Sequence, residues 1–79
     1  MNLPMTGEEK LQLALGVFRQ MDTPPGGGLP PTVFAVAAAR AGHRAMDVKG
    51  GLEIGARRRW FEIQPDGFVT LTHQGYDQV

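Results

Sequence analysis

The chain has 79 residues, of which 42% are apolar and 20% are charged, and it contains no cysteine. A chain of this length forms one small domain, residues 1–79, which buries only about 60% of its unfolded surface. We therefore expect no enzymatic activity and no cofactor. The lack of cysteine excludes disulfides and thiolate metal sites and favours a cytoplasmic location.

Two further classes are disfavoured by the sequence. The apolar runs are shorter than the roughly 20 residues that a membrane helix needs, and the N-terminus lacks the pattern of a signal peptide, so we expect no membrane partner. His43 and His73 stand far apart without other metal ligands nearby in sequence, so we expect no metal site.

Positive and negative charges are unevenly distributed along the chain. Eight basic side chains balance eight acidic ones, and the formal net charge is zero. The window from Arg40 to Trp60 nevertheless holds six basic and two acidic residues, a local charge of +4, which leaves −4 elsewhere. A local positive field of this kind attracts nucleic acid. The basic residues of the window are Arg40, Arg44, Lys49, Arg57, Arg58 and Arg59.

The first third of the chain predicts a helix followed by a loop. Thr6 and Glu9 have the spacing of a capping box, and apolar residues then recur at intervals of three and four. These features predict a helix over about 7–21. The segment 23–31 is rich in proline and glycine, so we expect a flexible loop that is mobile at 26–28.

A second helix is predicted from Pro31 to about Ala41, with Gly42 ending it. Its residues are apolar almost all round, so we expect neighbouring elements to enclose it.

The third segment, about 44–58, allows two interpretations because glycines interrupt its helical spacing. In the first, the helix continues and another helix approaches closely at Gly51 and Gly55. In the second, the helix ends near Gly50 and residues 52–54 form a short strand.

From Arg59 onward the apolar period changes to two. The runs 60–64 and 68–72 flank the turn sequence Pro-Asp-Gly, which predicts a two-stranded hairpin. We expect Trp60 to pack in the core. Thr72 is a candidate N-cap for a last helical turn.

The order of these elements resembles the winged helix-turn-helix family. The most specific residues are Leu71-Thr-His-Gln-Gly75, which are similar to the Leu-Thr-x-x-Gly signature that closes the wing in many bacterial regulators. The resemblance implies an α+β fold, with three helices in a winged helix-turn-helix and a two-stranded C-terminal β-hairpin as the wing. It also implies that residues 41–43 form the turn and that the third helix enters the major groove of DNA.

The resemblance and the basic window together predict a DNA-binding, transcription-regulatory module. Arg44 and Lys49 would lie near the groove, and Arg57 to Arg59 would contact the phosphate backbone. Arg40 is the remaining candidate for binding nucleic acid. The alternative is a protein–protein interaction or assembly module that does not bind DNA. It is favoured by acidic Asp66 at the wing tip and by the poor base-reading chemistry of the expected outward face, which holds Met46, Gly50, Glu53 and Arg57. A homodimer would have to use the first helix or the C-terminal segment.

Overall fold

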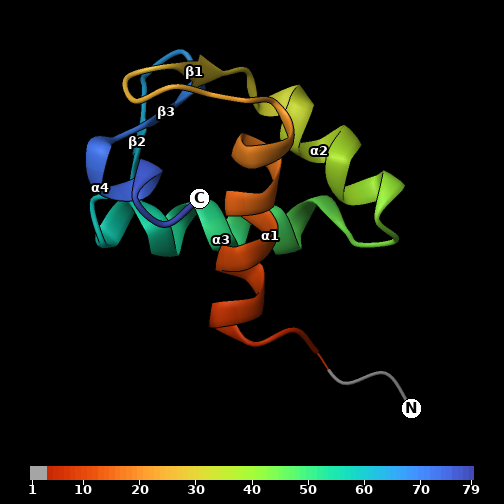
Figure 1. The fold of residues 1–79 in the computed structure, drawn as a ribbon. Coiled ribbons are helices and arrows are strands. Elements are labelled where there is room, and N and C mark those ends of the chain that lie inside the picture. The colour runs from red at the N-terminus through yellow and green to blue at the C-terminus, as the bar shows by residue number, and fades with distance from the viewer. Residues whose placement is uncertain (1–3) are drawn as a thin grey trace.

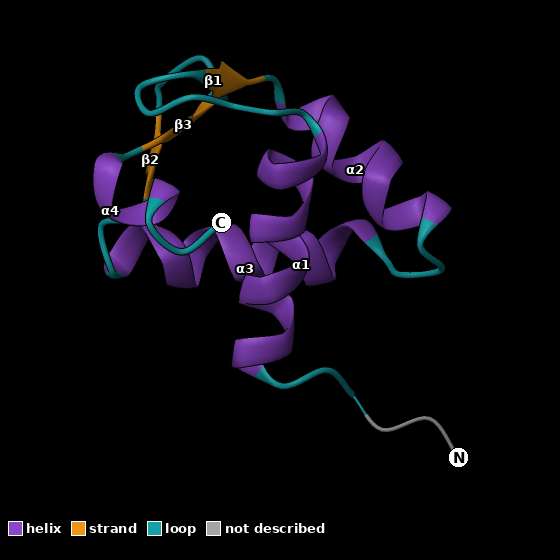
Figure 2. Cartoon of the chain, in the orientation of Figure 1, coloured by secondary structure: helices purple, strands orange, loops and turns teal. Residues whose placement is uncertain are grey.

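The structure, a computed structural model, describes residues 4–79, so residues 1–3 of the predicted single domain lie outside it. The fold is α+β, and its elements in chain order are α1 (Gly7–Gln20), β1 (Gly28–Leu29), α2 (Pro31–Arg40), α3 (Ala45–Arg57), β2 (Phe61–Ile63), β3 (Val69–Leu71) and α4 (His73–Tyr76). In Figure 1, α1 crosses α3 near its middle and α2 lies to one side. Figure 2 shows the strands gathered above the C-terminal end of α3, with α4 beside them.

The start of α1 confirms the predicted capping box. The Thr6 hydroxyl accepts a hydrogen bond from the Glu9 N–H at 3.1 Å, and the Glu9 carboxylate accepts one from the Thr6 N–H at 3.1 Å. The predicted apolar stripe of α1 turns into the core, where its fully buried members are Leu11, Ala14, Leu15 and Phe18. The capping box gives hydrogen-bond partners to the N–H groups of Thr6 and Glu9, which have no partner within the helix.

The predicted loop 23–31 is wrong in its second half, and the sheet contains one strand more than the predicted two-stranded hairpin. Gly28 and Leu29 pair antiparallel with β3, which makes a three-stranded sheet in the order β1-β3-β2. Gly26, predicted to be mobile, donates its N–H to the Leu71 carbonyl at 2.7 Å. Because β3 has hydrogen-bonding groups on both edges, the loop satisfies the edge that β2 leaves open. A two-residue strand has no periodicity by which the sequence could reveal it.

The hairpin itself forms as predicted. Phe61 pairs with Leu71 and Ile63 with Val69, and Gly67 adopts φ +93° in the turn between the strands. A positive φ is the conformation that favours glycine at this position.

The expected enclosure of α2 is wrong. Only Phe34 and Ala38 of this helix are buried, and Val36 is 49% exposed. The domain is too small to cover α2 on every side, so the helix keeps an apolar face in solvent.

The helix α3 continues through its glycines, which excludes the short strand at 52–54. A Cβ atom on Gly51 would lie 1.9 Å from the Lys10 carbonyl oxygen of α1, and one on Gly55 would lie 2.3 Å from the Phe61 ring. The predicted close approach of another helix is therefore confirmed at Gly51. At Gly55 it is wrong, because the neighbouring group there is the Phe61 side chain of β2.

Three phenylalanines join the helices to the sheet. The Phe18 ring of α1 packs edge-on against Phe34 of α2, with ring centroids 5.2 Å apart, and stacks on Phe61 of β2 at 4.9 Å. All three side chains are almost completely buried. Pairs of this geometry add about 0.5–1.5 kcal/mol each beyond the burial of their area.

The two helical glycines Gly51 and Gly16 give a matched test of the crossing. Gly51→Ala places a methyl group against the backbone of α1, so we expect a loss of about 3 kcal/mol or more in the free energy of unfolding. Gly16 has nothing within 4 Å of its Cβ position, so Gly16→Ala should add roughly 0.5–1 kcal/mol through helix propensity. Urea denaturation followed by circular dichroism measures both changes. Equal effects of the two substitutions would contradict the close crossing.

Candidate nucleic-acid interface

One face of α3 is directed to solvent and the other is held in the core. The residues Val48, Gly51 and Leu52 are buried, whereas the exposed stripe consists of Met46, Lys49, Glu53 and Arg57. Gly50 does not belong to this stripe, contrary to the sequence prediction. It is half-buried, and its Cβ position lies 3.1 Å from the Lys10 side chain. Lys49 thus occupies the middle of the exposed face.

The N-terminal end of α3 carries Arg44. The buried Asp47 carboxylate accepts a hydrogen bond from the Arg44 N–H at 3.4 Å, and the Arg44 Nε lies 3.8 Å from the same carboxylate. The Arg44 side chain is 76% exposed. A cation at this end gains nothing from the helix dipole, whose positive pole lies here, so the dipole gives no reason for an arginine at this position.

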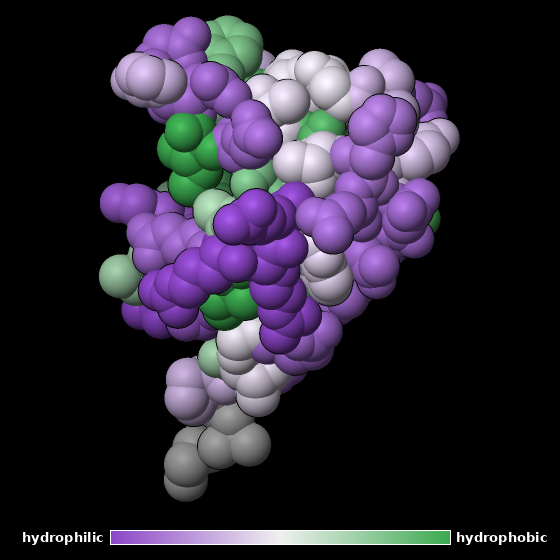
Figure 3. All heavy atoms as spheres, turned by 90° about the vertical axis from the view of Figure 1, so that its left-hand side faces the viewer, coloured by the Kyte–Doolittle hydropathy of each residue, from purple (hydrophilic) through white to green (hydrophobic). Residues whose placement is uncertain are grey.

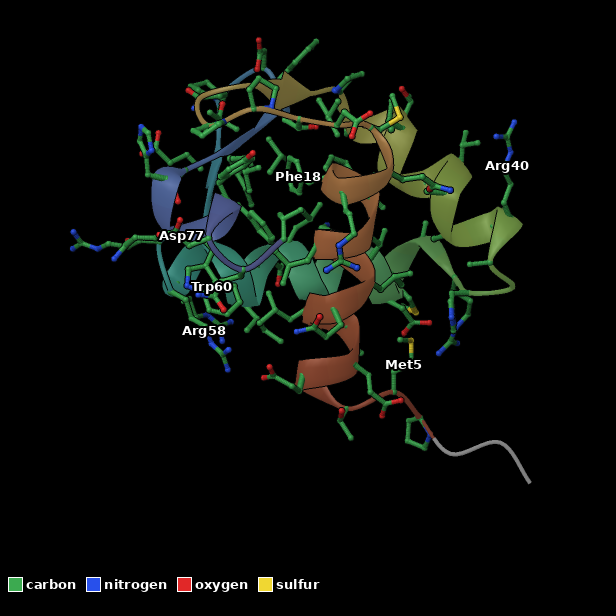
Figure 4. All side chains as sticks on the ribbon, in the orientation of Figure 1. Met5, Phe18, Arg40, Arg58, Trp60 and Asp77 are labelled. Atoms are coloured by element: carbon green, nitrogen blue, oxygen red, sulfur yellow. The ribbon has the colours of Figure 1, made fainter. Side chains whose placement is uncertain are left out.

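At the C-terminal end of α3, Arg58 is engaged within the chain. Its Nη2 lies 3.2 Å from the Glu8 carboxylate, and its guanidinium carbon lies 5.2 Å from the Trp60 ring centroid. Figure 4 shows Arg58 and Trp60 side by side at this end. Trp60 is partly buried and packs against the core, as predicted. Within residues 4–79, neither Arg57 nor Arg59 forms an ion pair, and both are exposed.

Arg59 has a backbone conformation that usually belongs to glycine. Its φ is +63°, and it follows the last residue of the helix cap. The Trp60 N–H donates to the Gly55 carbonyl at 2.8 Å and the Arg59 N–H to the Ala56 carbonyl at 3.1 Å, which is the Schellman pattern. An L-residue here costs about 1–2 kcal/mol relative to its preferred conformation. An arginine kept in such a conformation is a candidate for a functional role.

Thr72 and Gly75, from the Leu-Thr-x-x-Gly residues, hold the backbone after α3 in place. The Thr72 hydroxyl donates toward the Arg59 and Trp60 carbonyl oxygens, at 2.7 and 2.9 Å, and accepts from the Gly75 N–H at 3.0 Å. A Cβ on Gly75 would lie 2.1 Å from the Trp60 oxygen. The predicted cap at Thr72 is confirmed, and its link to Arg59 is a feature that sequence reasoning missed.

The basic window of the sequence does not form one patch. Arg40 and Arg58 lie at opposite ends of the molecule in Figure 4. Arg40 lies beside a hollow between α1 and α2, whereas Lys49 lies on the exposed face of α3. Figure 3, which faces the end where α4 and the end of α3 lie, shows strongly hydrophilic side chains across the middle of that face.

An apolar hollow of about 430 Å³ lies beside α3, between the start of α2 and the hairpin. Met46 from α3 is 61% exposed and Ile63 from β2 is 49% exposed at its edge. The sequence could not reveal this hollow because its residues come from separate elements. We refer to it as the α3–hairpin hollow.

Comparison with protein-family models, curated proteins and solved structures gives no match to this chain. Within residues 4–79, no three His, Cys, Asp or Glu side chains gather as metal ligands, and no helix is long and apolar enough to cross a membrane.

Arg59 and Arg57 give a second matched test. Arg59→Gly should stabilise the domain by about 1 kcal/mol, because glycine adopts positive φ without strain. Arg57→Gly puts the same residue in the last turn of α3 and should destabilise by up to about 1 kcal/mol. The midpoint of urea denaturation reports both. Destabilisation by Arg59→Gly would show that the arginine side chain itself stabilises the turn.

Thr72→Val keeps the shape of the side chain but removes the hydroxyl. We expect a loss of about 1–2 kcal/mol in the free energy of unfolding, because the cap of α4 and the bond to the segment after α3 disappear together. Thr70→Val is the control on β3, since the Thr70 hydroxyl only accepts a 3.4 Å bond from Gln64. Its effect should stay within about 0.5 kcal/mol, as β-branched valine suits a strand. Thermal unfolding by circular dichroism compares the two.

Proposed function

We propose that this chain is a winged helix-turn-helix domain that binds duplex DNA, with α3 in the major groove. The arrangement that the resemblance implies agrees with the order of the elements, in which three helices precede the β2–β3 hairpin. The turn between α2 and α3 also fits, since Gly42 takes φ +80° after the end of α2. A turn of this kind between two helices, often with glycine, is typical of the motif.

The observation that carries the proposal is the placement of cations at both ends of the solvent-exposed face of α3. Arg44 precedes α3 and Arg57 is its last residue, so they are separated by about 20 Å along the axis at 1.5 Å per residue. The major groove is about 12 Å wide, so a helix of this length brings cations to the phosphates on both sides. Lys49 lies between the two ends on the exposed stripe.

The side chains have different roles in this proposal. Arg44, Arg57 and Arg59 bind phosphates and supply affinity that does not depend on sequence. Lys49 is the cation closest to the base edges. Glu53 accepts from cytosine amino groups and disfavours a helix that lies along the phosphates. Arg58, paired with Glu8, contributes less.

Fluorescence anisotropy of a labelled 20-base-pair duplex of random sequence tests the proposal. We expect binding at low salt that weakens steeply as salt rises. The double variant Arg57→Ala and Arg59→Ala should reduce the slope of log K against log salt by about two units, because two phosphate contacts are lost. Arg19→Ala on α1 is the control, since it removes the same charge from another face, and it should change the slope by less than about half a unit.

Two results would contradict DNA binding through α3. One is no change in anisotropy at low salt. The other is equal weakening by the control and the double variant, which would assign binding to the net charge of the chain.

The α3–hairpin hollow favours a second candidate function, which is protein binding without DNA. Its lining is apolar, and Glu62 and Asp66 in the hairpin are exposed acids that repel phosphate. Exposed apolar patches beside polar rims mark protein interaction sites. If this candidate is correct, the duplex produces no change in anisotropy at low salt, and Met46→Ser abolishes capture of a cytosolic partner that the wild type retains.

A further inference from the structure

A second hollowed surface, with both apolar and polar residues, lies between α1 and α2. It consists of two adjoining hollows, of about 680 and 450 Å³, which share Val17, Gln20, Ala37 and Ala41. We refer to these two hollows together as the α1–α2 groove. Both helices contribute residues at intervals of three and four: Leu13, Gly16, Val17 and Gln20 from α1, then Val33, Val36, Ala37, Arg40 and Ala41 from α2 and its cap.

The groove combines exposed apolar side chains with polar ones, among them Gln20, Thr32 and Arg40. Val36 is 49% exposed and Met21 is 50% exposed, and both line it. Gly16 has nothing within 4 Å of its Cβ position, so no contact inside the domain requires a glycine there. A glycine in a helix costs about 1 kcal/mol relative to alanine. The α1–α2 groove therefore has a low floor at Gly16, with exposed apolar side chains beside it, over which another helix can pass closely.

The charge around the groove defines the chemistry of its occupant. Among residues 4–79, the charged residues that line the two hollows are Arg19 and Arg40, and no acidic residue lines either of them. A second copy of this chain in a two-fold dimer would bring these like charges into one interface, which is unfavourable. A segment with acidic side chains beside its apolar face is complementary to both arginines.

We propose that the α1–α2 groove binds an amphipathic, acidic helix of another protein. Apolar residues at i, i+3, i+4 and i+7 of that helix fill the groove, and flanking Glu or Asp residues pair with Arg19 and Arg40. The lining residues of the α1–α2 groove and of the α3–hairpin hollow do not overlap. DNA on α3 and a protein on the α1–α2 groove are thus compatible in one complex.

The probe is a synthetic 18-residue helical peptide with Leu at i, i+3, i+4 and i+7 and Glu on both flanks. Added to the ¹⁵N-labelled chain, it should shift amide resonances of α1 and α2 along the groove. A second peptide with Lys in place of each Glu should bind about tenfold more weakly or worse, because attraction at the rim becomes repulsion.

Two variants with equally exposed parent residues locate the site. Val36→Asp places a carboxylate in the α1–α2 groove, and Ile63→Asp places one at the α3–hairpin hollow; both parent side chains are 49% exposed. We expect Val36→Asp to weaken peptide binding about tenfold or more and Ile63→Asp to change it by less than about twofold, since rim charges far from a site have little effect. Circular dichroism confirms that each variant is folded.

Three results would overturn the proposal. The first is that the peptide shifts amide resonances of α3 and the hairpin, and that Ile63→Asp weakens peptide binding more than Val36→Asp does. The second is equal binding of the Glu and Lys peptides. The third is self-association of the chain alone through this groove, seen as concentration-dependent shifts there, which would make a second copy the occupant. Failure of DNA binding in the anisotropy experiment leaves this proposal unaffected, since the duplex and peptide use different faces.

Discussion

The contact between Gly51 of α3 and the Lys10 backbone of α1 is the constraint on which the other features depend. Because no side chain separates the helices at this point, α3 lies deep against α1 along its middle, and its two ends extend past the crossing. Gly55 then leaves room for the Phe61 ring, which brings the hairpin against the end of α3. Phe18 packs on both Phe61 and Phe34, so a single aromatic group fixes the sheet and α2 relative to the crossing.

Local rules were sufficient where the cause of a structure lies within a few residues. The capping box at Thr6, the cap at Thr72 and the turn at Gly67 all follow from neighbours in sequence, and all three form. The sequence leaves the path of α3 open because helix propensity penalises its glycines, whereas the reason for Gly51 is a contact with the Lys10 backbone, far away in the chain. The strand at Gly28 was missed for a similar reason, since only its partner on β3 makes it a strand.

The candidate site likewise has features that the sequence predicts and features that depend on the three-dimensional arrangement. The sequence contains a basic window between Arg40 and Trp60. The net charge of that window does not determine on which sides of the folded domain the basic side chains lie. Arg44 and Arg57 lie at opposite ends of the 13-residue helix α3. Arg58 forms an ion pair with Glu8 of α1, and Arg40 lies beside the hollow between α1 and α2. The hollows on either side of α2 were not predictable, because each combines residues from elements that do not adjoin in sequence.

The composition of α2 follows from the surfaces that surround it. Phe34 and Ala38 are buried in the core. Every other residue of Pro31–Arg40 except Ala39 lines either the α1–α2 groove or the α3–hairpin hollow. The polar residues of this helix, Thr32 and Arg40, both line the hollow between α1 and α2. An almost uniformly apolar helix is usually a sign of burial, but here it reflects three surfaces, the core and the two hollows, which together use nine of its ten residues. Polar substitutions at the exposed positions of α2 should thus leave the domain folded and alter one of the two hollows, whereas Ala39 lines neither of them.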